Sequence, residues 1–306
     1  MPLTNFPNGV TSFGIPLIGS GPVLTTGAVF FVSSVTGNNG NIGTDATKPF
    51  ATIAYALTKC TANNGDHIIC MPGHTETYTG ADGLDINVAG VTILGIGRGS
   101  NRPTFNFTTA GAADMNISAN NVALSNFLFT GGVDALSSIV DISGDDIYLG
   151  DIEYRDVTGE ATNFLNLGSG TDRCLIERLV FNGAAGAGGA SCIQASGTTR
   201  LTLRDFYIDG NFSTGAINFF SSASSGVDIS NGFIRNRNSV DIAVVDTVTG
   251  STGKIGPNLH IMLTDNAANI TEACTGATFI YFQPIRIINL QGESSMDTNI
   301  TASTDA

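Results

Sequence analysis

Carboxylate side chains gather in one short stretch of this sequence, "SGDDIYLGDIEYRD". Asp145 and Asp146 are adjacent there, and Asp151, Glu153 and Arg155 follow at alternate positions. Alternate residues of a strand share one face, so the last three side chains are expected to lie together. Two carboxylates on one face could bind calcium or work as an acid/base pair. The other interpretation is a solvated strand face whose charges compensate each other, and we favour it.

Two histidines are the remaining candidates for chemistry: His74 in "PGHTE" and His260 in "PNLHIML". Neither has a serine or cysteine partner at a recognisable spacing. A histidine beside threonine and glutamate in a corner is typical of a hydrogen-bonded turn residue. We therefore name no catalytic residue, no metal ligand and no cofactor.

The elements that must position these residues repeat along the chain. The frame of "LTLRDFYIDG" recurs in "VALSNFLFTG", "IYLGDIEYRD" and "CLIERLVFNG", and more weakly in "VDISNGFIRN". A shorter apolar segment precedes each copy, such as "MNIS", "FLNL" or "INFF". Both segments alternate with the period of a half-buried strand, and a phase slip divides the longer one into two strands. The copies are 25, 27, 27 and 26 residues apart at their apolar anchors, Leu124, Leu149, Ile176, Leu203 and Ile229.

Three short strands in each repeat, without helical periodicity between them, predict coils stacked into a right-handed parallel β-helix. Equivalent residues of successive coils then form inward ladders. One ladder is the set of anchors. A β-sandwich is the alternative, but its turns recur every 8–12 residues without a longer period. The second predicted ladder is Phe129, Tyr154, Phe181, Ile208 and Ile234.

The repeat also bears on the carboxylate group. The residues equivalent to Asp151 in other coils are Asn126, Arg178 and Asp205, so neighbouring coils do not extend an acidic site. Charged residues between the ladders are expected to face solvent. They are Asp151, Arg155, Glu177, Arg178, Arg204 and Asp205.

Composition excludes several classes of protein. The formal charge of −13 with scattered basic residues argues against nucleic-acid binding. There is no apolar run long enough to span a membrane, and no basic residue before Lys48 to begin a secretory signal. Five cysteines without metal-ligand spacing are expected to be reduced core thiols, which indicates assembly in a cytoplasm.

A different segment precedes the repeats, "GTDATKPFATIAYALTKCTANNGDHIICMPGHTETY". Apolar residues in "PFATIAYALTKC" have helical spacing, which predicts a helix near 50–61 that caps the first coil. This opening resembles the start of right-handed parallel β-helix proteins of the pectate-lyase-like superfamily, and more narrowly virion proteins of tailed bacteriophages. The similarity extends from about Val29 to about Arg237.

The resemblance implies a β-helix, but that family includes lyases, glycosidases, polysaccharide-cutting tailspikes and inert virion parts. Its phage members are typically homotrimers. Pectate lyases use several aspartates for calcium and an arginine as base, and only the group at Asp151 approaches that pattern. Saccharide grooves usually offer exposed aromatics, whereas this chain has no tryptophan and most of its 18 phenylalanines fall on inward positions. We therefore predict that the chain is not an enzyme.

The two ends differ from the repeats. Residues 1–28 hold four prolines, five glycines and no charged residue, and we predict an extended arm that anchors the protein to a partner. Residues 29–250 are assigned to the β-helix, residues 251–291 to C-terminal strands, and residues 292–306 to a polar tail. The predicted partner-binding residues of the arm are Phe6, Phe13, Ile15, Leu17 and Ile18.

The sequence thus leads to a specific expectation. The protein is a non-enzymatic, homotrimeric virion protein assembled in the host cytoplasm, which decorates the capsid and binds the major capsid protein or another virion protein. The alternatives are a tail fibre or spike that binds a receptor, and a polysaccharide-degrading tailspike or lyase.

Overall fold

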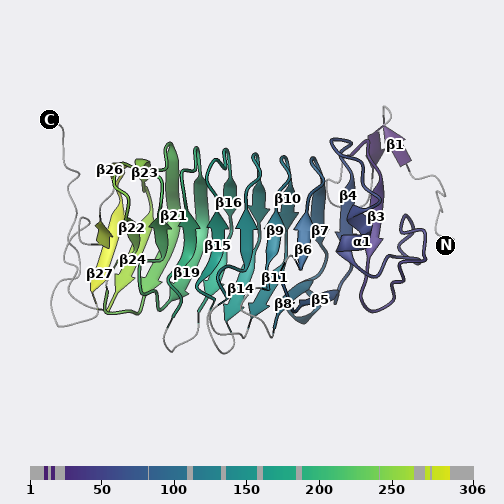
Figure 1. Cartoon of the computed structure of the whole chain (residues 1–306), viewed down its shortest axis with the longest axis horizontal. Helices are drawn as coiled ribbons and strands as arrows, with labels where there is room; N and C mark the ends of the chain where they lie inside the picture. Colours follow the sequence, from purple (N-terminus) through teal and green to yellow (C-terminus); the bar gives the residue numbers. More distant parts are fainter. Residues whose placement is uncertain are drawn as a thin grey trace.

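The computed structural model is a rod of stacked coils, drawn lengthwise in Figure 1. It describes residues 10–12, 15–17, 25–81, 83–108, 113–131, 136–156, 161–183, 188–240, 242–264, 273–275 and 278–289. Two parallel sheets run along the rod, and the fold is the predicted right-handed parallel β-helix. Within these residues no helix is both long and apolar enough to cross a membrane.

The larger sheet has seventeen described strands, two from most coils. In chain order they are β3 (Val29–Val32), β4 (His67–Cys70), β5 (Thr75–Tyr78), β7 (Thr92–Gly95), β8 (Thr104–Phe107), β10 (Ala123–Ser125), β11 (Leu128–Gly131), β13 (Tyr148–Gly150), β14 (Glu153–Asp156), β16 (Leu175–Glu177), β17 (Val180–Asn182), β19 (Thr202–Gly210), β21 (Val227–Asn236), β23 (Thr252–Ile255), β24 (Leu259–Leu263), β26 (Thr278–Tyr281) and β27 (Ile285–Asn289).

The smaller sheet has eight described strands, each from a different coil. They are β6 (Leu84–Ile86), β9 (Met115–Ile117), β12 (Val140–Ile142), β15 (Asn163–Leu167), β18 (Ser191–Ala195), β20 (Ile217–Phe219), β22 (Val244–Asp246) and β25 (Cys274–Thr275). A separate antiparallel pair, β1 (Val10–Ser12) and β2 (Ile15–Leu17), precedes the coils. Of the predicted arm residues, Ile15 and Leu17 lie on β2, and Phe6, Phe13 and Ile18 lie outside the described residues.

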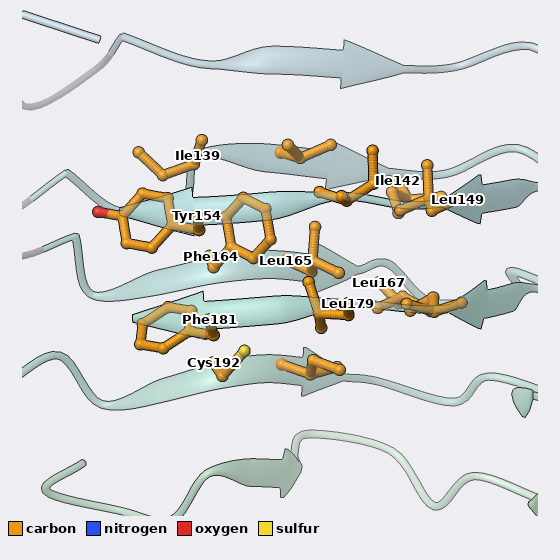
Figure 2. Packing of buried hydrophobic residues seen from close by; sticks show 14 of the residues in the cluster. Ile139, Ile142, Leu149, Tyr154, Phe164, Leu165, Leu167, Leu179, Phe181 and Cys192 are labelled. Carbon is orange, nitrogen blue, oxygen red and sulfur yellow. The ribbon is translucent and has the colours of Figure 1, made fainter. Parts of the chain in front are cut away.

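The pairing register confirms both predicted ladders. Leu124, Leu149, Ile176, Leu203 and Ile229 pair in succession and are 0–2% exposed. The aromatic ladder continues from Phe129 through Tyr154 and Phe181 to two isoleucines. Figure 2 shows buried side chains of the two sheets meeting inside the rod, among them Tyr154 and Phe164, which stack with their ring centroids 4.8 Å apart. Burial of these stacked side chains is the main contribution to stability.

The phase slip inside each longer segment is a backbone bend with one residue in the left-handed region. Asp151, Arg178, Asp205 and Asn231 occupy this position with φ between 52° and 55°. One residue beyond Asn231, the apolar ladder position is filled by Gly232, because a Cβ there would meet the ring of Phe206 from the coil below. The weakest copy of the repeat therefore still packs in register.

The cap confirms the predicted helix but in a shorter form, α1 (Ile53–Leu57). The Thr52 side chain accepts a hydrogen bond from the Tyr55 N–H and so begins the helix. The edge of β3 is covered by residues 43–50, since the Phe31 N–H donates to the Gly43 carbonyl and the Phe50 N–H to the Phe31 carbonyl. The first rung is thus closed against pairing with another chain.

All five cysteines are free thiols, as predicted. Cys70, Cys174, Cys192 and Cys274 are buried, and burial raises the pKa of Cys174 and Cys274 to about 12. A buried thiol with a raised pKa stays protonated and unreactive, so these cysteines act as small apolar core residues.

Candidate functional site: the charged face of the large sheet

The structure brings the predicted carboxylates together with arginines rather than with one another. Asp151 lies at the left-handed bend, and its two oxygens accept hydrogen bonds of 2.8 and 3.0 Å from Arg178 of the next coil. Glu153 accepts from Arg155 at 2.5 Å and from Arg102 at 2.8 Å. Each carboxylate therefore has a guanidinium partner, which supports the interpretation of a self-compensating face. In the described part of the chain, no three His, Cys, Asp or Glu side chains are placed to hold a metal ion.

Glu177 is the centre of this face, and the prediction that it faces solvent is wrong. It is only 8% exposed because Tyr148, Arg178 and Arg204 lie over it. The Tyr148 hydroxyl donates at 2.7 Å and the Arg204 Nη2 at 2.8 Å. The hydrogen bond from Tyr148, together with those from Arg204 and Arg178, lowers the pKa of Glu177 to about 2. Alternation in the sequence correctly predicted that Glu177 points outward from the sheet. It did not predict that neighbouring side chains would cover the carboxylate.

This pKa predicts a pH dependence. A carboxylate whose pKa is depressed in the folded state stabilises the protein above its ordinary pKa and loses that contribution as the pH falls through the folded value. Wild type should therefore melt at a higher temperature than Glu177→Gln above about pH 4.5, and the difference should vanish as the pH approaches about 2. Thermal melts of both proteins from pH 7 to pH 2 test this, and a constant difference over the whole range would contradict it.

A second charged ladder follows the corner that precedes β13 and β16. Asp146, from the "SGDD" group, binds Arg173, which also contacts Asp172, and Asp172 binds Arg200 of the next coil. Hydrogen bonds from Arg200 and Thr199 lower the pKa of Asp172 to about 2. Opposite charges therefore meet between successive coils, in the pairs Asp146–Arg173 and Asp172–Arg200, which favours the native register over a shifted one.

Sequence reasoning missed an enlarged bend between β7 and β8, which carries the short 3₁₀ turn η1 (Gly99–Asn101). In the later coils a single left-handed residue makes the corresponding bend. Here the longer bend lets the Arg102 side chain reach two coils along the rod, where it donates to the Glu153 carboxylate and the Asp151 carbonyl. The Arg102 side chain is 16% exposed. The "GRGSNRP" run, rich in glycine and proline, was the signal for a longer loop.

His74 is a buried structural residue, as its corner position predicted. Its Nδ1 accepts the Ser34 N–H at 2.9 Å, so the Nε2 proton points to Glu76, 3.0 Å away. Glu76 also accepts the Ile53 N–H at 2.6 Å and the Tyr78 hydroxyl at 2.8 Å. This cluster joins the first turn of α1 to the first coil. The other candidate, His260, is exposed on β24.

A small hollow is lined on one side by Gly183, Gly188 and Gly189. Its walls include Tyr154, Phe164, Phe181 and Phe212, which are only 1–6% exposed and offer no ring face to a ligand. The Ser191 hydroxyl is buried there without a hydrogen-bond partner. The hollow has room for about one water molecule, so it cannot accept a sugar ring.

Fold and surface together define a capped parallel β-helix protein with ion-paired sides. No protein-family model matches the chain, and no curated protein does. Among solved structures it is similar to a GH136 lacto-N-biosidase from Eubacterium ramulus, with a TM-score of 0.42 and 11% identity over 85% of this chain and 68% of that one.

That match corrects one prediction. The similar structure is an enzyme, which contradicts the expectation that this chain is not one, and we withdraw that expectation. The expectation had rested on the missing tryptophan and the sparse carboxylates, and neither observation excludes a reaction. The likeness is too distant to transfer an activity or a substrate to this chain.

Proposed function

We propose that this chain is a structural protein of a tailed-bacteriophage particle: a homotrimer, assembled in the host cytoplasm, that decorates the capsid and binds the major capsid protein through its N-terminal arm. The resemblance of the segment from Gly43 to Tyr78 to phage virion proteins supports this. Attachment to a particle and cleavage of a substrate are independent properties, so the structural role is proposed without excluding catalysis.

The observation that carries the proposal is a rod whose coils are tied to one another on the outside as well as in the core. Ion pairs join neighbouring coils through Asp151 and Arg178, Glu177 and Arg204, and Asp228 and Lys254. Each exposed pair contributes little, but a series of them along continuous ladders resists separation of the coils. The Glu76 cluster fixes the cap at the first rung. Such a rod, capped at its first rung and ion-paired along its side, suits a part that must stay folded on the outside of a particle.

The sequence of the arm supports the mode of attachment. Residues 1–24 have no charged side chain, so burying these side chains against a shell costs no ion desolvation. An apolar segment of this length, which includes the β1–β2 pair, can bury roughly 1,000 Å² against a partner, which suffices for a stable interface. The arm must be cut before Thr25, because the Thr25 hydroxyl binds the Gly65 carbonyl and accepts the Gly27 N–H.

Deleting residues 1–24 is expected to leave the circular dichroism and the melting temperature nearly unchanged, because Thr25 and the cap are kept. The same deletion should abolish co-sedimentation with phage particles that lack this protein, whereas the full-length chain should co-sediment. A chain that lacks the polar residues 292–306 is the matched control and should still bind.

Co-sedimentation of the truncated chain would exclude the arm as the anchor and would favour the strands β26 and β27. Failure of the full-length chain to bind, or its location on the tail in a reconstruction of the particle, would contradict a capsid role.

A further inference from the structure

The outer side of the large sheet changes character in its last coils. We call the outward side chains of β19, β21, β23, β24, β26 and β27 the C-terminal face. Pairing aligns them in two ladders. One ladder is Thr202, Asp228, Lys254 and Ile280. The other is Tyr207, Phe233, His260 and Arg286.

Large apolar side chains are exposed on this face. Ile280 is 67% exposed, Phe282 beside it 47% and Tyr207 40%. The rings of Tyr207 and Phe233 stack at 5.0 Å with an angle of 10° between them. Each ring thus covers one face of the other. Exposed aromatic side chains and arginines on one surface are the composition of a protein interface.

The charge of this face is opposite to that of the chain. Together with Arg237, just after β21, its strands hold five basic and three acidic residues, a formal charge of +2. The whole chain has a charge of −13, which leaves −15 for the rest of it. The basic residues are Arg204, Arg235, Arg237, Lys254 and Arg286, and the acidic ones are Asp205, Asp209 and Asp228.

We infer that the C-terminal face binds a second copy of this chain, on a surface of that copy other than its own C-terminal face. The inference rests on the homotrimer proposed above. Contact of the face with itself would bring like charges together, whereas contact with an acidic surface of another copy, outside the ion-paired side of the large sheet, is attractive. A contact between two different surfaces forms a ring when the rotation between neighbouring copies closes, and a ring of three copies is a trimer.

Light scattering on the full-length protein tests this. Tyr207→Ser combined with Phe233→Ser removes the aromatic contact, and Arg286→Glu alone reverses one exposed charge. Both should reduce the mass from three chains to one, or raise the subunit dissociation constant at least tenfold. Raising the salt from 0.05 to 0.5 M should weaken wild-type association, because exposed charges are screened.

Matched controls come from the same outer side of the sheet. Leu128 precedes Tyr207 in its ladder by three coils, and Arg155 is 53% exposed. Leu128→Ser and Arg155→Glu should therefore stay trimeric, and melting temperatures should show that every variant is folded. If wild type is a trimer and the variants on the C-terminal face are folded trimers too, this inference is wrong and the proposed trimer stands. A monomeric wild type would contradict the trimer itself.

Discussion

Replacing Leu203 with asparagine is expected to lower the free energy of unfolding by about 4 kcal/mol or more. Leu203 is 1% exposed and lies between Ile176 and Ile229 in the interior ladder. The change removes a buried leucine and leaves an amide among apolar side chains of three coils, with no group there to bind it. Urea denaturation followed by circular dichroism measures the loss.

The control is the neighbouring residue. Thr202 is half-buried and points to the outer side of the same strand, so Thr202→Asn should cost less than about 1 kcal/mol. Equal stabilities of the two variants would show that Leu203 does not face the interior. A deficit only for Leu203→Asn would confirm the inward direction of the whole ladder, since the pairing register fixes the directions together.

Removing the Glu76 carboxylate is expected to destabilise the protein by an amount similar to that of Leu203→Asn, but the loss should be local to the cap. Glu76→Ala takes away the acceptor for the Ile53 N–H, His74 and Tyr78, three groups that are themselves buried. Leaving such donors unpaired costs about 1–3 kcal/mol for each of the three groups, so the free energy of unfolding of the cap should fall by about 3 kcal/mol or more. Hydrogen exchange of residues 53–57 should become much faster than that of the later coils.

Glu76→Gln keeps the size and shape of the side chain but removes its negative charge. The amide keeps one acceptor oxygen, so the loss should be about half that of alanine. Accelerated exchange spread evenly over the coils after Glu76→Ala would contradict a role in holding the cap. Lys59 lies just beyond the C-terminal end of α1 and its side chain contacts the ring of Tyr55 in a cation–π interaction, so Lys59→Ala should leave the exchange rates of the cap nearly unchanged.

The fold could be predicted from the sequence alone because every coil of a β-helix needs apolar residues at the same inward positions. A stack of Leu124, Leu149 and Ile176 can be recognised from spacing and polarity, since each inward position must be apolar in every coil. The bend residues Asp151 and Arg178 appeared as a phase slip for the same reason. The cap was visible as the one segment with helical instead of alternating periodicity, although its helix is shorter than its apolar pattern.

Only the tertiary structure decided what the polar residues do. Side-chain partners come from coils about 26 residues away, and no local pattern tells whether Glu177 meets solvent or the guanidinium of Arg204. Arg102 reaches across two coils, a contact set by the path of an irregular bend. Exposure of Tyr207 and Phe233 likewise depended on which ladder each ring joined. Apolar burial repeats and can be predicted from periodicity, whereas polar contacts are specific pairs that depend on the exact approach of distant segments.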